Sequence, residues 1–122
     1  MTEMKLGMVE ARFADIIWAQ EPFTTKELVA LCDEQLNWKR TTTYTVLKKL
    51  CDRGLFQVTD RVITAKLSRD EFYAIQCEHF VEETFSGSLP AFIAAFTARK
   101  ALTPAEQNEI KKLMDALGDN QV

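Results

Sequence analysis

A change of hydrophobic period at Gly54 is the feature that most constrains the fold of this chain. Before it, in the stretch 38–53, apolar side chains recur at helical spacing and form one stripe, made of Val46, Leu47, Leu50 and Cys51. After it, β-branched and aromatic residues occupy 55–58 and 62–65, on either side of the polar turn Thr59-Asp60-Arg61. The pattern predicts an amphipathic helix that Gly54 ends in a left-handed cap, followed directly by a two-stranded hairpin.

Two shorter helices are expected before this one. The first carries the apolar residues Met8, Val9, Phe13, Ile16 and Ile17 and stops near Gln20, because the residue before Pro22 is pushed out of the helical region. The second starts at the capping-box pair Thr24 and Glu27 and runs to about Gln35, and a short link over 37–40 follows. Its buried face is expected to consist of Leu28, Val29, Leu31, Cys32 and Leu36. Helix, helix, short turn, helix and hairpin together predict a winged helix-turn-helix with a two-stranded wing.

Beyond Ser68 the chain returns to helical patterning. Ser68 and Glu71 form a second capping box, and the helix they open is expected to reach about Thr84 and to end at Ser86-Gly87-Ser88. A short apolar helix over 89–97 and a last helix opened by Thr103-Pro104-Ala105-Glu106 complete the chain. We therefore expect a mainly α protein with a winged-helix domain at residues 1–68 and a helical dimerisation region at 69–122.

The apolar faces of the C-terminal helices have too few partners within one chain of 122 residues, because the winged helix already has a complete core. A symmetric homodimer would bury them, since two-fold homodimers are the commonest oligomers, although folding back onto their own domain stays an alternative. The residues expected at this dimer interface are Phe80, Phe85, Leu89, Phe92, Ile93, Phe96, Ile110, Leu113, Met114 and Leu117.

The polar side of the third helix predicts contact with double-stranded DNA. Hydroxyl-bearing side chains there can reach base edges, and these are Thr41, Thr42, Tyr44 and Thr45. Basic side chains can neutralise phosphates, and these are Lys39, Arg40, Lys48, Lys49 and Arg53, joined by Arg61 at the wing tip. The helix N-terminus, with its free N–H groups, adds to the attraction for a phosphate.

The distribution of charge supports this interpretation although the whole chain has a net charge of −3. Residues 39–69 hold eight basic and two acidic side chains, a net of +6, whereas 1–38 and 70–122 carry −4 and −5. Because binding depends on where charge lies, the basic block overrides the acidic total. A winged helix that binds proteins without DNA is the alternative, but such a helix would expose apolar anchors where this one has Thr and Lys.

Other function classes find little support in the sequence. The single histidine, His79, and the lack of nucleophile or phosphate-loop motifs argue against an enzyme, and no cofactor or metal is expected. The chain has no apolar run long enough for a membrane span and no signal-peptide pattern, so a cytoplasmic protein is expected. The three cysteines, Cys32, Cys51 and Cys77, are expected to be reduced, packed thiols.

Taken in order, several motifs resemble the penicillinase repressor family of BlaI, MecI and CopY type. They are the run W-x-x-x-T-x-x-T-x-L-K-x-L-x-x-x-G from Trp38 to Gly54, the stretch S-R-D-E-F-Y from Ser68, and F-x-G-S-L from Phe85. The resemblance implies a dimeric repressor with an N-terminal winged helix and a C-terminal dimerisation arm, bound to a palindromic operator before genes for β-lactam resistance or copper handling. It also implies operator contacts for Thr42, Thr45 and Lys49.

The chain departs from the family pattern at several points. Thr41 and Tyr44 stand where many members have a basic residue and a glutamine or similar polar group, and the wing is shorter than in staphylococcal-type members. Members that respond to β-lactams are cut by a sensor protease at an Asn-Phe bond. The equivalent pair here is Ala95-Phe96, so whether this chain has a protease partner stays an open question. The C-terminus lacks the Cys-x-Cys pairs of copper-responsive members, which argues against induction by metal-thiolate binding.

Overall fold

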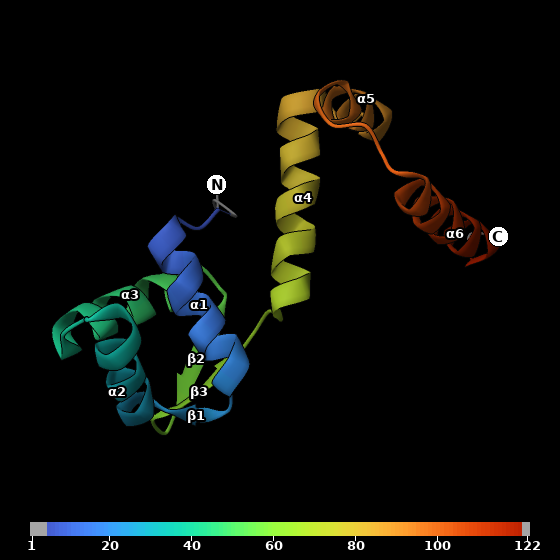
Figure 1. Cartoon of the computed structure of the whole chain (residues 1–122). Coiled ribbons are helices and arrows are strands. Elements are labelled where there is room, and N and C mark those ends of the chain that lie inside the picture. Colours follow the sequence, from blue (N-terminus) through green and yellow to red (C-terminus); the bar gives the residue numbers. More distant parts are fainter. Residues whose placement is uncertain (1–4, 121–122) are drawn as a thin grey trace. The chain divides into compact units, whose positions relative to one another are not determined.

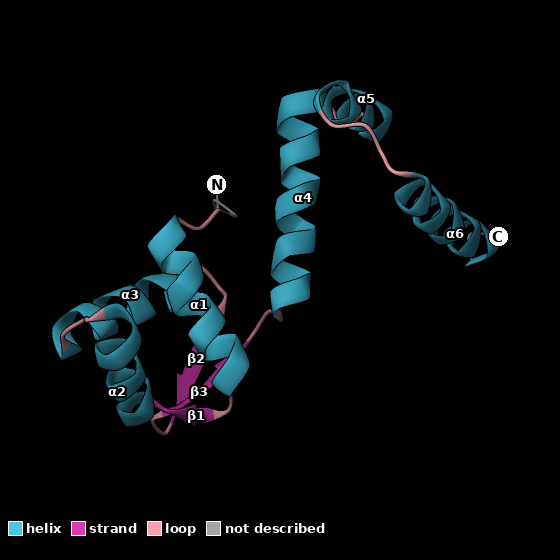
Figure 2. Cartoon of the chain, viewed as in Figure 1, coloured by secondary structure: helices cyan, strands magenta, loops and turns pink. Residues whose placement is uncertain are grey.

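The computed structural model describes residues 5–120, with side chains up to residue 118. Within that range the chain forms six helices and three short strands (Figures 1 and 2). They follow in the order α1 (Met8–Gln20), β1 (Phe23–Thr24), α2 (Thr25–Leu36), α3 (Arg40–Asp52), β2 (Phe56–Thr59), β3 (Val62–Ala65), α4 (Arg69–Phe85), α5 (Leu89–Arg99) and α6 (Pro104–Asn120). The chain divides into two compact units, one up to Phe80 and one from Val81, which are described separately.

The first unit is a winged helix, as the sequence predicted. Three helices and the hairpin enclose a core whose fully or nearly fully buried side chains come from every element of the unit. They are Phe13, Ala14, Ile16, Ile17, Phe23, Leu28, Cys32, Leu47, Leu50, Leu55, Phe56, Ile63 and Phe72. Trp38 stacks on Phe13 at a centroid distance of 5.4 Å, which closes the end of this core beside the turn between α2 and α3.

The sheet has one strand more than the sequence predicted. The expected hairpin is present, with β2 and β3 antiparallel and Thr59 paired to Val62. The additional strand β1 pairs antiparallel with β3, Phe23 opposite Ile63, which gives the order β1-β3-β2. A two-residue strand has no readable period, so the sequence pattern could not reveal it.

The helix ends follow their local capping chemistry. The hydroxyl oxygen of Thr24 accepts the backbone N–H of Glu27 at 3.1 Å, and Ser68 accepts that of Glu71 at 3.0 Å. At the end of α3, Gly54 has φ +89°, and the N–H of Leu55 bonds to the carbonyl of Leu50 at 3.1 Å. This is the left-handed glycine cap that the change of period predicted.

Burial within the helices differs from the sequence prediction at several positions. On α3 the fully buried polar residue is Thr43, while Val46 and Cys51 are only half-buried. Met8 and Val9, expected on the inner stripe of α1, are 85% and 48% exposed, so the buried side of α1 begins at Phe13.

The boundary between the units lies inside α4 and not at its start, where the sequence had suggested it. Phe72 is fully buried in the core of the first unit, and Trp18 lies 5.8 Å from its ring. The indole N–H of Trp18 also donates to the carbonyl of Leu67 at 2.9 Å, which fixes the segment that leads into α4. The first turns of α4 are therefore part of the winged-helix unit.

The second unit is helical, and its side chains pack lightly. Phe85 and Phe92 meet edge to face at 5.8 Å, but α5 contains no fully buried residue. Ser88 caps α5 by accepting the N–H of Ala91, and Thr103 caps α6 by accepting the N–H of Glu106. Among the described helices, none combines the length and the apolar composition needed to cross a bilayer.

Candidate nucleic-acid interface

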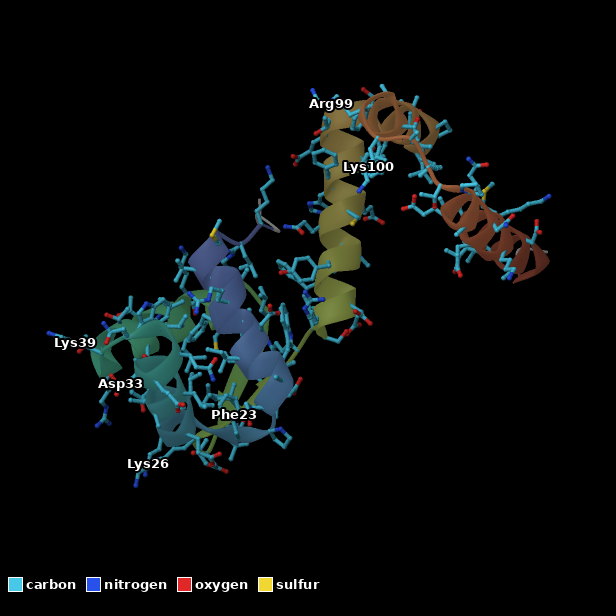
Figure 3. All side chains as sticks on the ribbon, viewed as in Figure 1. Phe23, Lys26, Asp33, Lys39, Arg99 and Lys100 are labelled. Carbon is cyan, nitrogen blue, oxygen red and sulfur yellow. The ribbon has the colours of Figure 1, made fainter. Side chains whose placement is uncertain are left out.

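The solvent-facing side of α3 carries the residues that the sequence assigned to DNA. Thr43, Leu47 and Leu50 point into the core, so the helical period turns the intervening positions outward. The exposed residues of this surface, including the N-cap, are Lys39, Arg40, Thr41, Thr42, Tyr44, Thr45, Lys48 and Lys49. Figure 3 shows Lys39 projecting away from the unit at the beginning of this surface. We call these eight residues the α3 face.

Two threonines of α3 are held by the helix itself. The hydroxyl of Thr45 donates to the carbonyl of Thr41 at 2.9 Å, and that of Thr43 donates to the carbonyl of Lys39 at 3.1 Å. Thr45 lies on the exposed side with its hydroxyl proton engaged, so in this conformation it offers an acceptor oxygen and a methyl group. These are the groups that meet an amino group or a thymine methyl on a base edge.

Lys48 has a weak internal partner. Its Nζ lies 3.0 Å from Oδ2 of Asp52 one turn later, and both side chains are largely exposed, at 79% and 66%. Exposed pairs of this kind contribute little free energy, because water and salt screen them. Lys48 can therefore exchange this partner for a phosphate at small cost.

An open cleft of about 530 Å³ lies beside the α3 face, between the start of α2 and the wing. It is lined by Thr25, Lys26, Val29, Arg40, Tyr44, Val58 and Arg61. Three of these side chains are cationic, and the Arg40 guanidinium lies 5.5 Å from the centroid of the Tyr44 ring. The cleft brings Arg40, Tyr44 and Arg61 together, as the sequence prediction requires if they share one ligand.

Lys26 is a candidate site residue that sequence reasoning missed. It lies in the first turn of α2, points outward (Figure 3) and lines the cleft together with Arg40 and Arg61. The first turn of a helix lies at the positive end of the helix dipole, so a cation there strengthens the attraction for an anion. The available signal was its position two residues after the predicted N-cap Thr24.

The wing tip is anchored to the same helix start. Asp60 and Arg61 both have positive φ, at 51° and 65°, which is the geometry of a two-residue hairpin turn of type I′. The carbonyl of Arg61 accepts the N–H of Thr25 at 3.0 Å. This bond holds the turn in a conformation that non-glycine residues seldom adopt, and it places the exposed Arg61 side chain at the cleft.

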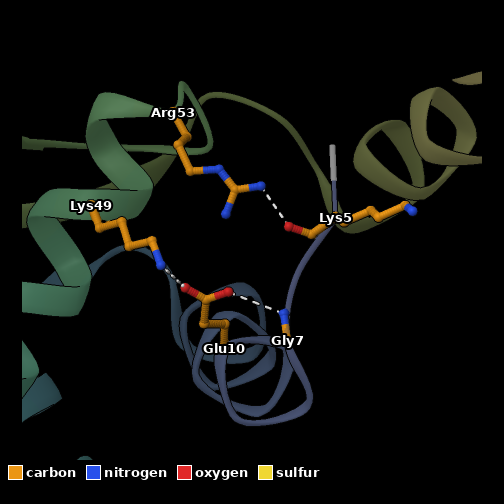
Figure 4. Close-up of polar contacts among 5 residues, drawn as sticks. All are labelled: Lys5, Gly7, Glu10, Lys49 and Arg53. Carbon is orange, nitrogen blue, oxygen red and sulfur yellow. Dashed lines mark hydrogen bonds and ion pairs between the residues drawn. The ribbon is translucent and has the colours of Figure 1, made fainter. Parts of the chain in front are cut away.

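Lys49 and Arg53 lie on the opposite flank of α3, where Lys49 contacts the first turn of α1 and Arg53 contacts the segment before it (Figure 4). Nζ of Lys49 is 2.6 Å from Oε2 of Glu10, and the Arg53 guanidinium donates to the backbone carbonyl of Lys5. Oε1 of Glu10 accepts the N–H of Gly7 at 3.0 Å. The bond to Lys49 and then the bond from Gly7 hold the pKa of Glu10 below its ordinary value.

The predicted DNA-binding residues thus fall into three groups. Arg40, Tyr44 and Arg61 line the cleft. The second group is exposed on α3 and its N-cap and consists of Lys39, Thr41, Thr42, Thr45 and Lys48. Lys49 and the half-buried Arg53 form the third group, and internal acceptors already engage both.

The residues expected at a dimer interface leave much apolar surface exposed within the chain. In the second unit seven of them are between 37% and 65% exposed, and these are Leu89, Ile93, Phe96, Ile110, Leu113, Met114 and Leu117. Phe80, at the end of the first unit, is 43% exposed, while Phe85 and Phe92 are half-buried against each other. On α6 the four apolar residues recur at helical spacing and form one stripe.

The cysteines differ from the expectation that all three are packed. Cys32 is buried and Cys51 half-buried, and burial raises the pKa of both thiols. Cys77 is exposed, because its position on α4 turns away from the core that receives Phe72. All three are free thiols.

Comparison with known proteins agrees with this arrangement. A family model described as penicillinase repressor matches residues 6–116, a range that covers the winged helix and most of the C-terminal helices. No curated protein gave a match. The family assignment indicates a DNA-binding transcriptional repressor and not an enzyme. The chain belongs to the penicillinase repressor family.

Proposed function

We propose that the protein is a dimeric repressor that inserts α3 into the major groove of a palindromic operator and blocks transcription by occupying the promoter. The observation that carries the proposal is the composition of the α3 face, where hydroxyls and cations replace apolar anchors. Within α3, Tyr44 is the one large apolar side chain that is exposed, and at 37% it is only marginally so. A protein-binding helix would expose more large apolar side chains.

In the proposed complex the cleft receives the sugar-phosphate backbone next to the groove that α3 enters. Lys26, Arg40 and Arg61 would surround one or two phosphates, and the positive end of the α2 dipole would add to their attraction. Thr41 and Thr45 would then face base edges, with Lys48 on a flanking phosphate. Contacts to phosphates set most of the affinity and make it depend on salt.

A fluorescence-anisotropy titration with a pool of labelled duplexes tests the DNA-binding part. We expect binding at low ionic strength whose log Kd rises with log salt concentration, and Arg40→Ala or Lys48→Ala should lower that slope by about 0.9 per lost phosphate contact. Lys111→Ala is the matched control, since it removes an exposed lysine from α6 in the other unit. Absence of binding, with the fold intact, would favour a protein-interaction module instead.

Dimerisation is proposed to occur through the exposed apolar side chains of the C-terminal unit. Each half-site alone binds weakly, so the link between two winged helices supplies the affinity through a raised effective concentration. Leu113→Glu combined with Leu117→Glu places two charges in the stripe of α6, where both residues are 60% exposed or more. Sedimentation at micromolar concentration should give a dimer for the unaltered chain and a monomer for this variant.

Proteolytic induction is not part of the proposal. The Ala95–Phe96 bond lies within α5, and a protease would need that helix to open before it could bind the bond in extended form.

A further inference from the structure

We propose that Glu10 is an internal counter-ion that competes with DNA phosphate for Lys49 and so sets how strongly the recognition helix binds. The inference rests on the proposed DNA-binding function and adds a residue of α1 to the determinants of affinity. It also separates Lys49 from the other cations of the α3 face, although Lys49 lies on the same helix.

The carboxylate of Glu10 is fixed in place from two sides. Oε2 is 2.6 Å from the Lys49 ammonium, and Oε1 accepts the backbone N–H of Gly7 at 3.0 Å (Figure 4). Its side chain is only 21% exposed, so water screens it less than a surface carboxylate. The lowered pKa of Glu10 means that the carboxylate stays ionised throughout the physiological range.

The neighbouring pair on α3 provides a contrast. Lys48 and Asp52 are 79% and 66% exposed and are neighbours on one helix, so their pair opens easily. Glu10 instead belongs to a different helix from Lys49 and is oriented by a backbone bond of its own. Of the two lysines, Lys49 is therefore the one whose charge is neutralised before DNA arrives.

This neutralisation has a measurable consequence. A phosphate that approaches Lys49 also approaches the Glu10 carboxylate, so the pair offers no net charge to exchange for counter-ions of the duplex. Lys49 should then contribute almost nothing to the salt dependence of binding while Glu10 is ionised. Removal of the carboxylate charge should add one phosphate contact per protomer.

The test is a double-mutant cycle in the full chain, read by duplex anisotropy between 50 and 200 mM salt. Glu10→Gln keeps an oxygen for the Gly7 N–H but loses the charge, and we expect it to steepen the salt slope by about 0.9 per protomer. Over that salt range the variant should lose ~3- to 4-fold more affinity per protomer than the unaltered chain. Lys49→Ala alone should leave the salt slope nearly unchanged. In the Lys49→Ala background, Glu10→Gln should not change the salt slope either.

Asp52→Asn is the matched control because it also removes one acid that pairs with a lysine of α3. If removal of any nearby negative charge strengthens binding, Asp52→Asn and Glu10→Gln will act alike and both will act in the Lys49→Ala background. That outcome overturns the proposal. The proposal is also overturned if Glu10→Gln leaves the salt slope unchanged while the unaltered chain binds duplex with ordinary salt dependence. In that case the DNA-binding function stands, and Glu10 only links α1 to α3. If the unaltered chain does not bind duplex at all, the proposed function itself fails.

Discussion

Truncation of Phe72 to alanine should strongly destabilise the winged helix even though this residue lies beyond the wing. Its ring is fully buried and lies 5.8 Å from Trp18, and it also packs edge to face on Tyr73 at 5.1 Å. Loss of a buried phenylalanine costs about 3–5 kcal/mol, from lost transfer free energy and the cavity left behind. A unit of roughly 75 residues has a total stability of about 4–11 kcal/mol, so the variant should lose at least about a quarter of it, and all of it if the unit lies at the lower end of that range.

Urea unfolding followed by tryptophan fluorescence measures this loss selectively. The chain has two tryptophans, Trp18 and Trp38, and both lie in the first unit, so the signal reports that unit. Glu78→Ala is the control on the same helix, since an exposed position should change the free energy of unfolding by no more than about 0.5 kcal/mol. The loss in the free energy of unfolding for Phe72→Leu should lie between those of these two variants, and it can still be measured if Phe72→Ala does not fold. A loss below about 1 kcal/mol for Phe72→Ala would refute the packing of α4 into the winged-helix core.

Three further predictions follow from local features. Gly54→Ala should cost about 1–2 kcal/mol in the same urea assay, because φ is +89° and no atom lies within 4 Å of an added Cβ, so the loss is purely conformational and an unchanged midpoint would contradict it. A thiol reagent should modify Cys77 quickly in the native protein, the half-buried Cys51 more slowly, and the buried Cys32 only on unfolding; equal rates for all three would contradict the burial. Lys49→Ala should raise the pKa of Glu10 toward 4.5, as followed by carboxyl NMR titration. Because the folded pKa is the lower one, the Glu10–Lys49 pair stabilises the fold above the ordinary glutamate pKa and loses that effect as pH falls through the lowered value.

The parts of the fold that the sequence predicted well depend on neighbouring residues. The capping boxes at Thr24, Ser68 and Thr103 each join a side chain to a backbone group three residues away, so spacing alone reveals them. The glycine cap of α3 and the hairpin that follows it are similarly local. These elements suffice to identify a winged helix.

The parts that were missed depend on contacts between residues distant in sequence. Strand β1 exists because β3 pairs with it. Thr43 can be buried in the core because its hydroxyl donates to the carbonyl of Lys39. A pattern based on hydrophobicity counts threonine as polar and places it outside. The early turns of α4 join the first unit because Phe72 reaches its core, and no composition change marks that point in the sequence.

The candidate site shows the same division. The helical period was enough to predict that the α3 face points outward. The position of Lys26 at the cleft that Arg61 lines follows only from the fold. The pairing of Lys49 with Glu10 joins two helices that are separated by the whole of α2, and a count of basic residues cannot distinguish a neutralised lysine from an available one. The sequence therefore predicted which side of α3 is exposed, whereas the structure distinguishes the cations on it by their partners.

The central claim is that α3 is the element that contacts duplex DNA, and backbone amide NMR of the chain titrated with duplex tests it most directly. The account predicts that shift changes at low ionic strength concentrate in α3, the wing tip at Asp60 and Arg61 and the first turn of α2, and weaken as salt is added. Shift changes confined to α6, or a spectrum unaltered by duplex at low salt, would contradict it.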